Sequence, residues 1–441
     1  MNLFSKIFYK KKILIYGMGK TGLSSYNYLK RDNQIFLYDD NKKTFKKKSL
    51  RKLFLDKNKI HHFKFDYIVI SPGININNCN LKNYLRKNSK KIITDLDIFF
   101  SHHKRNNIIT ITGTNGKSTT AKLLNQILKN HNRDSRLCGN IGNPILLEKN
   151  ISKKTIFVIE ASSYQIDYSK LFKTNYAIIL NISPDHLERH SSIINYVNAK
   201  FKLVKKQSRK DFAYMNVKDK YLKRKIKNSK VLSKIINVNL KAINNFKKKI
   251  TNPYFSTQGY QENLSFIFSI GQKLNLQNKK IIQIINKFKG LKYRQEIIYK
   301  SNKIKFINDS KATSFASSEN ILKSLQKVFW LVGGITKLGD KFALKKNECK
   351  NINAYVFGRN KSFFVKQFRN KLSYYCFKDL KSAVKQVLID VNNDSNNLHK
   401  TVLFSPSAAS FDSFKNFEER GDYFNFLLKK YKVKKIINVL K

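Results

Sequence analysis

Short runs of consecutive hydrophobic residues recur along this chain, and most end at a glycine, a serine, an asparagine or an acidic residue. Such runs predict strands of a parallel sheet, which are covered on both faces and lack an alternating polar side. Stretches with helical spacing, such as residues 23–30 and 120–128, lie between them. We expect strands at residues 12–16, 34–38, 67–70, 107–111, 156–159, 176–180, 304–307, 328–332, 354–357 and 402–404.

A glycine-containing loop joins the strand at 107–111 to the helix at 120–128. This arrangement predicts a phosphate-binding loop, because glycines admit backbone N–H groups to the phosphate and the helix N-terminus favours an anion. Lys117 can reach the terminal phosphates of ATP, and the hydroxyl of Ser118 can bind Mg²⁺. The general P-loop has a further glycine where Ile111 stands, and the alternative is an ordinary glycine turn. The predicted nucleotide-binding residues are Gly113, Thr114, Asn115, Gly116, Lys117, Ser118 and Thr119.

Polar residues follow two strands of the same block. Glu160 ends one strand and His186 follows the next, so both side chains are expected near the phosphate loop. A carboxylate and an imidazole at such positions can be ligands of a phosphate-bound Mg²⁺. Alone, either would be interpreted as a solvated strand end.

The first block begins with a strand, the spacing G-x-G-x-x-G at residues 17–22, a helix and a second strand ending at Asp39. This pattern is typical of a Rossmann-like βαβ unit, in which the acidic residue contacts a ribose or base. A Rossmann-like fold without a dinucleotide is the common alternative. Gly73 follows a third strand, where open α/β sheets bind ligands.

These patterns predict an α/β fold of three domains, since 441 residues are too many for one compact core. We expect a Rossmann-like domain at residues 1–94, a central P-loop-type ATPase domain with a mostly parallel sheet at 95–290, and a second Rossmann-like domain at 291–441.

The charge is extreme, with 88 Lys and Arg against 28 Asp and Glu, a net +60. This suggests a polyanionic partner, but the lysines are scattered, and the abundant residues share A/T-rich codons. We therefore favour codon bias over nucleic-acid binding. The four cysteines form no C-x-x-C pair, which fits a reducing cytosol and supports neither a disulfide framework nor a zinc site. No apolar run approaches the roughly 20 residues of a membrane span, and we expect a cytoplasmic monomer with no membrane partner.

Six motifs occur along the chain: G-T-N-G-K-S-T at 113–119, E-A-S-S-Y-Q at 160–165, N-I-S-P-D-H-L at 181–187, Y-V-N-A-K at 196–200, N-D-S-K-A-T at 308–313 and the segment 405–421. Together these motifs resemble those of the Mur ligases, the ATP-dependent amide-forming enzymes of peptidoglycan synthesis. The resemblance extends over nearly the whole chain and is most specific in the last segment.

This resemblance implies a ligase that uses ATP and Mg²⁺ to join UDP-N-acetylmuramoyl-L-alanine to D-glutamate. It implies that Lys117, His186 and Lys200 are catalytic, that Ser118 and Glu160 bind one Mg²⁺, and that His186 and a carbamylated Lys200 bind a second. Adenine and ribose would contact Asn263, Arg294 and Asp309. The sugar nucleotide would contact Lys20, Thr21, Asp39, Gly73 and Asn140, and D-glutamate would contact Thr313, Lys337, Ser410, Phe411 and Phe417.

The alternative interpretation is that the polar residues are solvated loop positions without a ligand, and that Phe411 and Phe417 belong to a helix core. Three positions depart from the family pattern. Gly259-Tyr260 replace a His-Asn pair, Tyr293 replaces a histidine before Arg294, and Leu338 replaces a glycine. The first two departures affect adenine packing, and the third affects the amino-acid side.

Two other functions are compatible with parts of the sequence. A folylpolyglutamate synthase shares the ATP loop and adds glutamate, but it lacks a first domain like residues 1–94. A nucleic-acid-binding P-loop ATPase would explain the charge of +60, yet no RNA-binding signature is present. An assay of phosphate release distinguishes all three.

Overall fold

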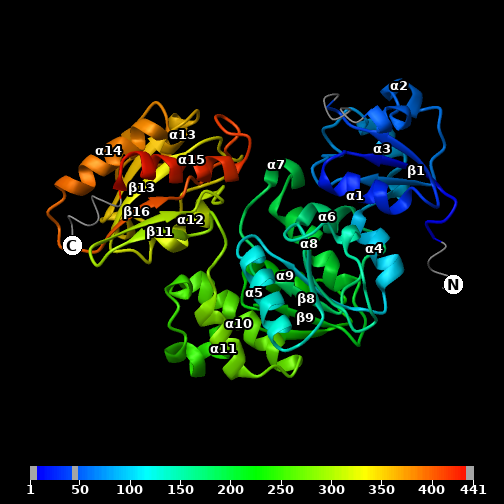
Figure 1. Cartoon of the computed structure of the whole chain (residues 1–441), viewed down its shortest axis with the longest axis horizontal. Coiled ribbons are helices and arrows are strands. Elements are labelled where there is room, and N and C mark those ends of the chain that lie inside the picture. The colour runs from blue at the N-terminus through cyan, green and yellow to red at the C-terminus, as the bar shows by residue number, and fades with distance from the viewer. Residues whose placement is uncertain (1–6, 42–47, 434–441) are drawn as a thin grey trace. The chain divides into compact units, whose positions relative to one another are not determined.

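The computed structural model describes residues 7–41 and 48–433, and Figure 1 labels its elements. The chain divides into two compact units. The first contains the described residues of Met1–Ile182, Arg189–Lys249 and Glu262–Ile285, and the second those of Ser183–Glu188, Ile250–Gln261 and Asn286–Lys441. The chain passes from the second unit to the first inside helix α10 (Gln258–Lys273).

The N-terminal sheet of the first unit has the strand order β2-β1-β3-β4, and its strands are parallel. The helix expected from residue 23 begins at Lys20 instead, directly after Gly19 at the N-cap. Lys20 and Thr21 therefore lie in the first turn of a helix. The elements are β1 (Lys12–Tyr16), α1 (Lys20–Leu29), β2 (Gln34–Tyr38), α2 (Lys57–Ile60), β3 (Tyr67–Ile70), α3 (Lys82–Lys87) and β4 (Ile92–Ile93).

The central sheet of the first unit has the order β10-β9-β8-β5-β7-β6, again with parallel pairing. β5 lies between β7 and β8, so the carboxyl ends of these three strands are adjacent. The strands are β5 (Asn107–Thr112), β6 (Ser135–Gly139), β7 (Ile156–Glu160), β8 (Tyr176–Ile179), β9 (Phe212–Met215) and β10 (Lys234–Asn237). The helices along this part of the chain are α4 (Asp95–His103), α5 (Lys117–Asn130), α6 (Ser163–Tyr168), α7 (Leu187–His190), α8 (Ile193–Lys205), α9 (Lys220–Lys227), α10 and α11 (Asn278–Lys287).

The sheet of the second unit has the order β11-β12-β16-β13-β14-β15. β11 is antiparallel to β12, and the other pairs are parallel. The strands are β11 (Glu296–Lys300), β12 (Ile304–Asn308), β13 (Lys327–Gly333), β14 (Ile352–Phe357), β15 (Ser373–Cys376) and β16 (Lys400–Phe404). The helices are α12 (Phe315–Leu322), α13 (Lys361–Phe368), α14 (Leu380–Asn393) and α15 (Phe417–Lys430).

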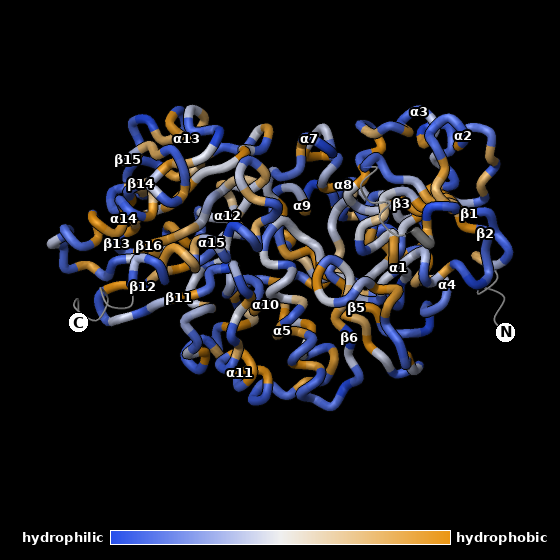
Figure 2. Tube along the Cα trace, turned by 45° about the horizontal axis from the view of Figure 1, so that its top comes forward, coloured by the Kyte–Doolittle hydropathy of each residue, from blue (hydrophilic) through white to orange (hydrophobic). Residues whose placement is uncertain are grey.

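Both faces of this last sheet are buried, which explains its continuous hydrophobic runs. In β13, Phe329 and Leu331 pack with residues of α14 and α15, while Trp330 packs on the opposite face with residues of α12 and α13. Hydrophobic positions follow the strands throughout the chain, and hydrophilic positions dominate the loops (Figure 2).

The expected strands are all present, and the α/β class with parallel sheets is confirmed. The domain bounds 1–94, 95–290 and 291–441 stay a prediction. Over residues 7–41 and 48–433, no helix combines the length and the hydropathy needed to cross a bilayer.

Candidate active site

The phosphate loop has backbone conformations that require glycine. Gly116 is the N-cap of α5 with φ +81°, and Gly113 has φ +150°. A Cβ on Gly116 would lie 2.3 Å from the Nδ2 atom of Asn263 in α10. The loop conformation is therefore maintained both by backbone geometry and by close packing against a predicted adenine residue.

Asn181 fixes the loop from the end of β8. Its backbone carbonyl accepts a hydrogen bond from Thr114 N at 3.0 Å. Its side chain accepts from Asn115 N at 2.9 Å and donates to Asn115 O at 3.2 Å. The motif at 181–187 contains this residue, but its contact with the loop is visible only in three dimensions.

Lys117 is the first residue of α5, and its side chain folds back onto the preceding phosphate loop. Its ammonium donates to Gly113 O at 2.9 Å and to Thr114 O at 2.7 Å. A cation held at a glycine-containing loop and a helix N-terminus suits the terminal phosphates of a nucleotide.

Ser118, Glu160 and Asn140 meet at the end of β7. Ile111 in β5 is paired with Glu160, so the carboxylate emerges beside the start of α5. One oxygen accepts from Ser118 Oγ at 2.6 Å and the other from Asn140 Nδ2 at 3.0 Å, and Glu160 is only 1% exposed. A buried hydroxyl and carboxylate provide the hard oxygen ligands that Mg²⁺ prefers.

Lys200 reaches the same loop from α8. It is 2% exposed, with Nζ 2.9 Å from Gly113 O and 3.4 Å from Thr112 Oγ1. Tyr196, one helical turn earlier, contacts Thr114 Oγ1 through its hydroxyl at 3.2 Å. The spacing of Y-x-x-A-K thus places both side chains on the phosphate loop.

His186 belongs to the second unit, whereas Lys117, Glu160 and Lys200 belong to the first. It has φ +55°, and its ring lies 3.4 Å from Asp185 and 3.5 Å from Glu188. Among the described residues, no group of three or more His, Cys, Asp and Glu side chains could hold a metal.

Lys337 pairs with Asp185, a residue that was not among the predicted site residues. The ammonium lies 2.6 Å from Asp185 Oδ1, and both side chains are largely buried. His186, Ser314 and Asp340 line the same small pocket, next to Thr313.

Burial raises the pKa of Asp340 to about 6, against the opposing effects of the Phe315 N–H and of Lys337. Leu338, the residue that departs from the family pattern, also lines this pocket and is 75% exposed.

Asp309 follows β12 and is buried in the second unit. Its carboxylate accepts from Gln295 N at 3.1 Å and from Ser405 Oγ at 2.9 Å. Burial raises its pKa to about 7, although these hydrogen bonds and the arginines Arg294 and Arg420 act in the opposite direction. Asn263 belongs to the first unit, so the predicted adenine set is divided between the units.

A chain of buried hydroxyls continues from Asp309. Ser405 Oγ lies 2.6 Å from Ser318 Oγ, which lies 2.7 Å from Ser407 Oγ. All three serines are fully buried. Hydroxyls can donate or accept, so the direction of these bonds depends on what lies at the end of the chain.

Tyr293, which stands where the family has histidine, is a packed residue. Its hydroxyl donates to Asp422 at 2.6 Å, and its ring lies so close to Gly421 that a Cβ there would be 2.3 Å away. Tyr260, at the other adenine-side departure, donates to Tyr254 at 2.9 Å. Both tyrosines pack within the second unit. At these two positions, aromatic packing stands where the family pattern has histidine or asparagine.

The predicted glutamate-binding residues of segment 405–421 differ in environment. Ser410 is buried, whereas Phe411 is 72% exposed and lies before α15. The alternative that Phe411 belongs to a helix core is therefore wrong. Phe417 begins α15, and the ammonium of Lys311 lies 3.7 Å from its ring centroid. Lys311 is a nearby cation that sequence reasoning did not single out.

The N-terminal motif G-x-G-x-x-G has a local structural role. A Cβ on Gly22 would lie 1.9 Å from Gly17 O, so the third glycine permits close packing of α1 on β1. Asp39 accepts from Met18 N at 2.6 Å and from Asn41 N at 2.8 Å. Gly73 is exposed in the loop after β3. These residues meet at the carboxyl end of the sheet, where a ligand is expected.

Comparison with known proteins defines the class. The model of the Mur ligase middle domain matches residues 111–279, and a model described as C2185-like, N-terminal, matches residues 9–93. The fold is similar to that of a MurF ligase from Thermotoga maritima solved in complex with ADP, with a TM-score of 0.58, 14% identity and coverage of 98% of this chain and 100% of that chain. A UDP-N-acetylmuramate-alanine ligase from the same organism has a TM-score of 0.54, 16% identity and coverage of 96% and 100%. The fold is that of the Mur ligases.

Relatives with higher sequence identity identify the group within this family to which the chain belongs. The UDP-N-acetylmuramoylalanine--D-glutamate ligase of Rickettsia bellii is 34% identical, and the alignment covers 94% of this chain and 96% of the relative. The enzyme of the same name from Prochlorococcus marinus is 33% identical, with coverage of 94% and 96%. The chain belongs to the Mur ligase family and, within it, to the UDP-N-acetylmuramoylalanine--D-glutamate ligases.

Proposed function

We propose that this protein joins D-glutamate to UDP-N-acetylmuramoyl-L-alanine with hydrolysis of ATP to ADP and phosphate, in the cytoplasmic synthesis of peptidoglycan precursors. The observation that carries this proposal is the phosphate loop with the buried Ser118–Glu160 contact, in a chain whose full-length relatives have that name. The predicted domains 1–94, 95–290 and 291–441 would bind the sugar nucleotide, ATP and glutamate respectively.

The chemistry requires activation of a carboxylate, which is a poor electrophile. Transfer of the γ-phosphoryl group to the alanine carboxylate releases ADP and forms an acyl phosphate. The amine of D-glutamate then attacks the carbonyl carbon, and the tetrahedral intermediate expels phosphate. Because carboxylate and phosphate repel each other, positive charge at their meeting point lowers the barrier.

Lys117 would hold the β- and γ-phosphates, since its ammonium already lies over the loop. Ser118 and Glu160 would hold a first Mg²⁺, which supplies charge neutralisation at the phosphates. An ammonium has no lone pair, so Lys200 can bind a second Mg²⁺ beside His186 only after carbamylation. Its position 2.9 Å from Gly113 O supports this role, because a carboxylate added to Nζ would lie close to the phosphate loop.

The remaining predicted residues would position substrates. Lys337 would face a carboxylate of D-glutamate in exchange for Asp185, with Thr313, Ser410, Phe411 and Phe417 beside it. Asn263, Arg294 and Asp309 would contact adenine and ribose. Lys20, Thr21, Asp39, Gly73 and Asn140 would contact the sugar nucleotide.

A phosphate-release assay tests the proposal. We expect release only when ATP, Mg²⁺, UDP-N-acetylmuramoyl-L-alanine and D-glutamate are all present, and none when L-glutamate replaces D-glutamate. Stimulation by RNA or DNA with no response to the sugar nucleotide would contradict it and favour a nucleic-acid-dependent ATPase. Activity with a folate acceptor would favour the folylpolyglutamate synthase class.

A further inference from the structure

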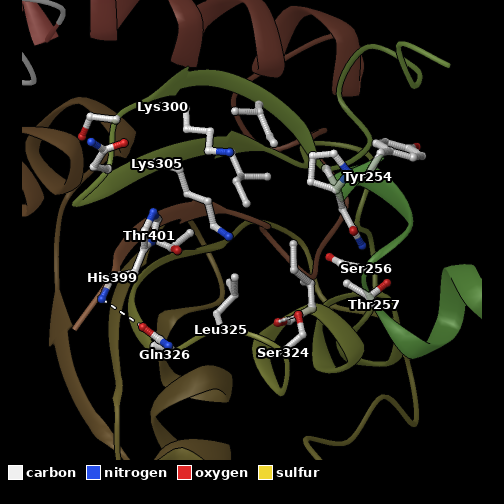
Figure 3. A pocket seen from close by; sticks show the side chains of 17 residues that line it. Tyr254, Ser256, Thr257, Lys300, Lys305, Ser324, Leu325, Gln326, His399 and Thr401 are labelled. Carbon is white, nitrogen blue, oxygen red and sulfur yellow. Dashed lines mark hydrogen bonds between the residues drawn. The ribbon is translucent and has the colours of Figure 1, made fainter. Parts of the chain in front are cut away.

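A second polar pocket, of about 520 Å³, lies in the second unit on one side of β11, β12 and β16 (Figure 3). Residues 253–257 and 324–326 complete its wall. A pocket of this size accommodates a small metabolite.

Three basic side chains line this pocket. Lys300 in β11 is paired with Lys305 in β12, and Lys305 is paired in turn with Thr401 in β16. Directly opposed residues lie on the same face of a sheet, so the two ammonium groups and the Thr401 side chain face one cavity, with His399 at its edge (Figure 3). None of the lining residues that the structure describes is Asp or Glu.

The two opposed lysines and the buried hydroxyl carry a cost in the folding free energy of the protein. Like charges directly opposed across strands destabilise a sheet, and in the described chain neither lysine forms an ion pair. Burial and the charge of Lys300 lower the pKa of Lys305, and burial and Lys305 lower the pKa of His399. The Thr401 hydroxyl oxygen is buried and has no hydrogen-bond partner among the described residues. An anion would relieve these costs.

Abundant lysine alone does not explain the pocket. Lys303 lies on the same hairpin but is exposed, as expected for a lysine without a ligand, whereas Lys305 is half-buried. Ile297, Ile321 and Leu325 form an apolar part of the wall. The combination of basic and apolar surface fits a ligand with a phosphate at one end and a ring or carbon chain at the other.

We propose that this pocket binds a small organic phosphate, with the phosphate between Lys300 and Lys305 and the organic part against the apolar wall. The phosphate position differs from the predicted ribose site, because Lys305 and Asp309 are four residues apart along an extended strand, roughly 13 Å. The two sites adjoin at Gln295, which lines the pocket and donates to Asp309 from its backbone. The proposal is independent of the ligase reaction, since none of its residues is assigned to that reaction.

Calorimetric titration with inorganic pyrophosphate tests the site in the full chain carrying Lys117→Ala, which weakens anion binding at the phosphate loop. Adding Lys305→Gln should weaken the remaining binding by about tenfold, the effect of losing one charged hydrogen bond. Lys303→Gln removes the same charge at an exposed position of the hairpin that does not line the pocket, and it should change the affinity less than about twofold. Thr401→Val should also weaken binding while leaving the fold unchanged.

Equal weakening by Lys303→Gln and Lys305→Gln would overturn the proposal and indicate diffuse electrostatic attraction. Absence of pyrophosphate binding in the Lys117→Ala protein would overturn it as well. Circular dichroism confirms folding of each variant, and if Lys305→Gln fails to fold, Lys300→Gln gives the same comparison. A nucleoside diphosphate should bind this site more tightly than pyrophosphate, and weaker binding would contradict the role of the apolar wall.

Discussion

Glu160→Gln separates the contribution of the β7 carboxylate to stability from its contribution to ligation. Two hydrogen bonds, from Ser118 at 2.6 Å and Asn140 at 3.0 Å, end on this buried side chain. Glu160→Ala removes both and leaves a cavity, so at about 1.5–3 kcal/mol per bond it should cost about 3–6 kcal/mol. In Glu160→Gln, the amide oxygen can accept from Asn140 and the amide nitrogen can donate to Ser118, because a hydroxyl can reverse its role. The free energy of unfolding should therefore change by less than about 1 kcal/mol.

Ligation should respond differently, because an amide cannot replace an anionic oxygen at a magnesium ion. We expect Glu160→Gln to lower kcat/KM by about 100-fold or more, comparable to removing one electrostatic contact at a transition state, and to raise the Mg²⁺ concentration needed for half-maximal rate. Urea unfolding and phosphate release at varied Mg²⁺ measure the two effects.

The matched control is Glu148→Gln, which alters a partly exposed carboxylate bonded to Asn143 and should leave the rate unchanged. Full activity with an unaltered Mg²⁺ requirement in Glu160→Gln would refute the metal assignment. A loss of stability as large as that of Glu160→Ala would refute the reversal of the Ser118 hydrogen bond.

Three further predictions concern other residues of the site. Lys117→Ala should abolish ligation while the circular dichroism spectrum stays that of the folded protein; near-normal turnover would rule out its phosphate role. Lys200→Ala should lose most activity, and a short carboxylic acid added in solution should restore part of it by supplying the missing oxygen ligand; full activity without rescue would exclude the carbamate. The folded-state pKa of Asp309 is raised to about 7 from 3.8, so its stabilising contribution is present below about pH 4 and is lost as the pH rises through 7. Asp309→Asn should therefore gain stability relative to the wild type, by on the order of a few kcal/mol, between pH 4 and pH 8 in urea unfolding, and parallel pH profiles would contradict this.

The predictable part of the fold is the part buried on both faces. β7 and β13 are mostly hydrophobic, as is β5 between its polar residues Asn107, Thr110 and Thr112, and each of the three has a neighbouring strand on either side. The strands β4, β6, β9, β10, β11 and β15 were not predicted, although β9 lies inside its sheet. β6 and β15 are edge strands with fewer buried positions, and their sequences include Arg136 or three exposed residues. β10 is an edge strand of the same kind, without a fully buried residue.

The site was predictable where its residues are contiguous. The loop from Gly113 to Thr119 can be recognised in the sequence because its strand, its glycine turn and its helix are consecutive. The contacts of Asn181 with Asn115 and of Lys337 with Asp185 join segments that are 66 and 152 residues apart, and a sequence does not show which distant residues touch. The relation of His186 to Lys200 stays a prediction, because the two residues belong to different units.

The buried serines that are hydrogen-bonded in a row from Asp309 extend the effect of its protonation beyond its own contacts. When Asp309 is ionised, Ser405 donates to it and must accept from Ser318, which then accepts from Ser407. When Asp309 is protonated, it can donate to Ser405, and every hydroxyl along the row can turn around. Because successive hydrogen bonds polarise one another, such a row behaves as a switch with two orientations rather than as three separate contacts. The protonation state of Asp309 therefore sets the direction of the hydrogen bonds as far as Ser407, which lies in the loop after β16, three residues before Ser410.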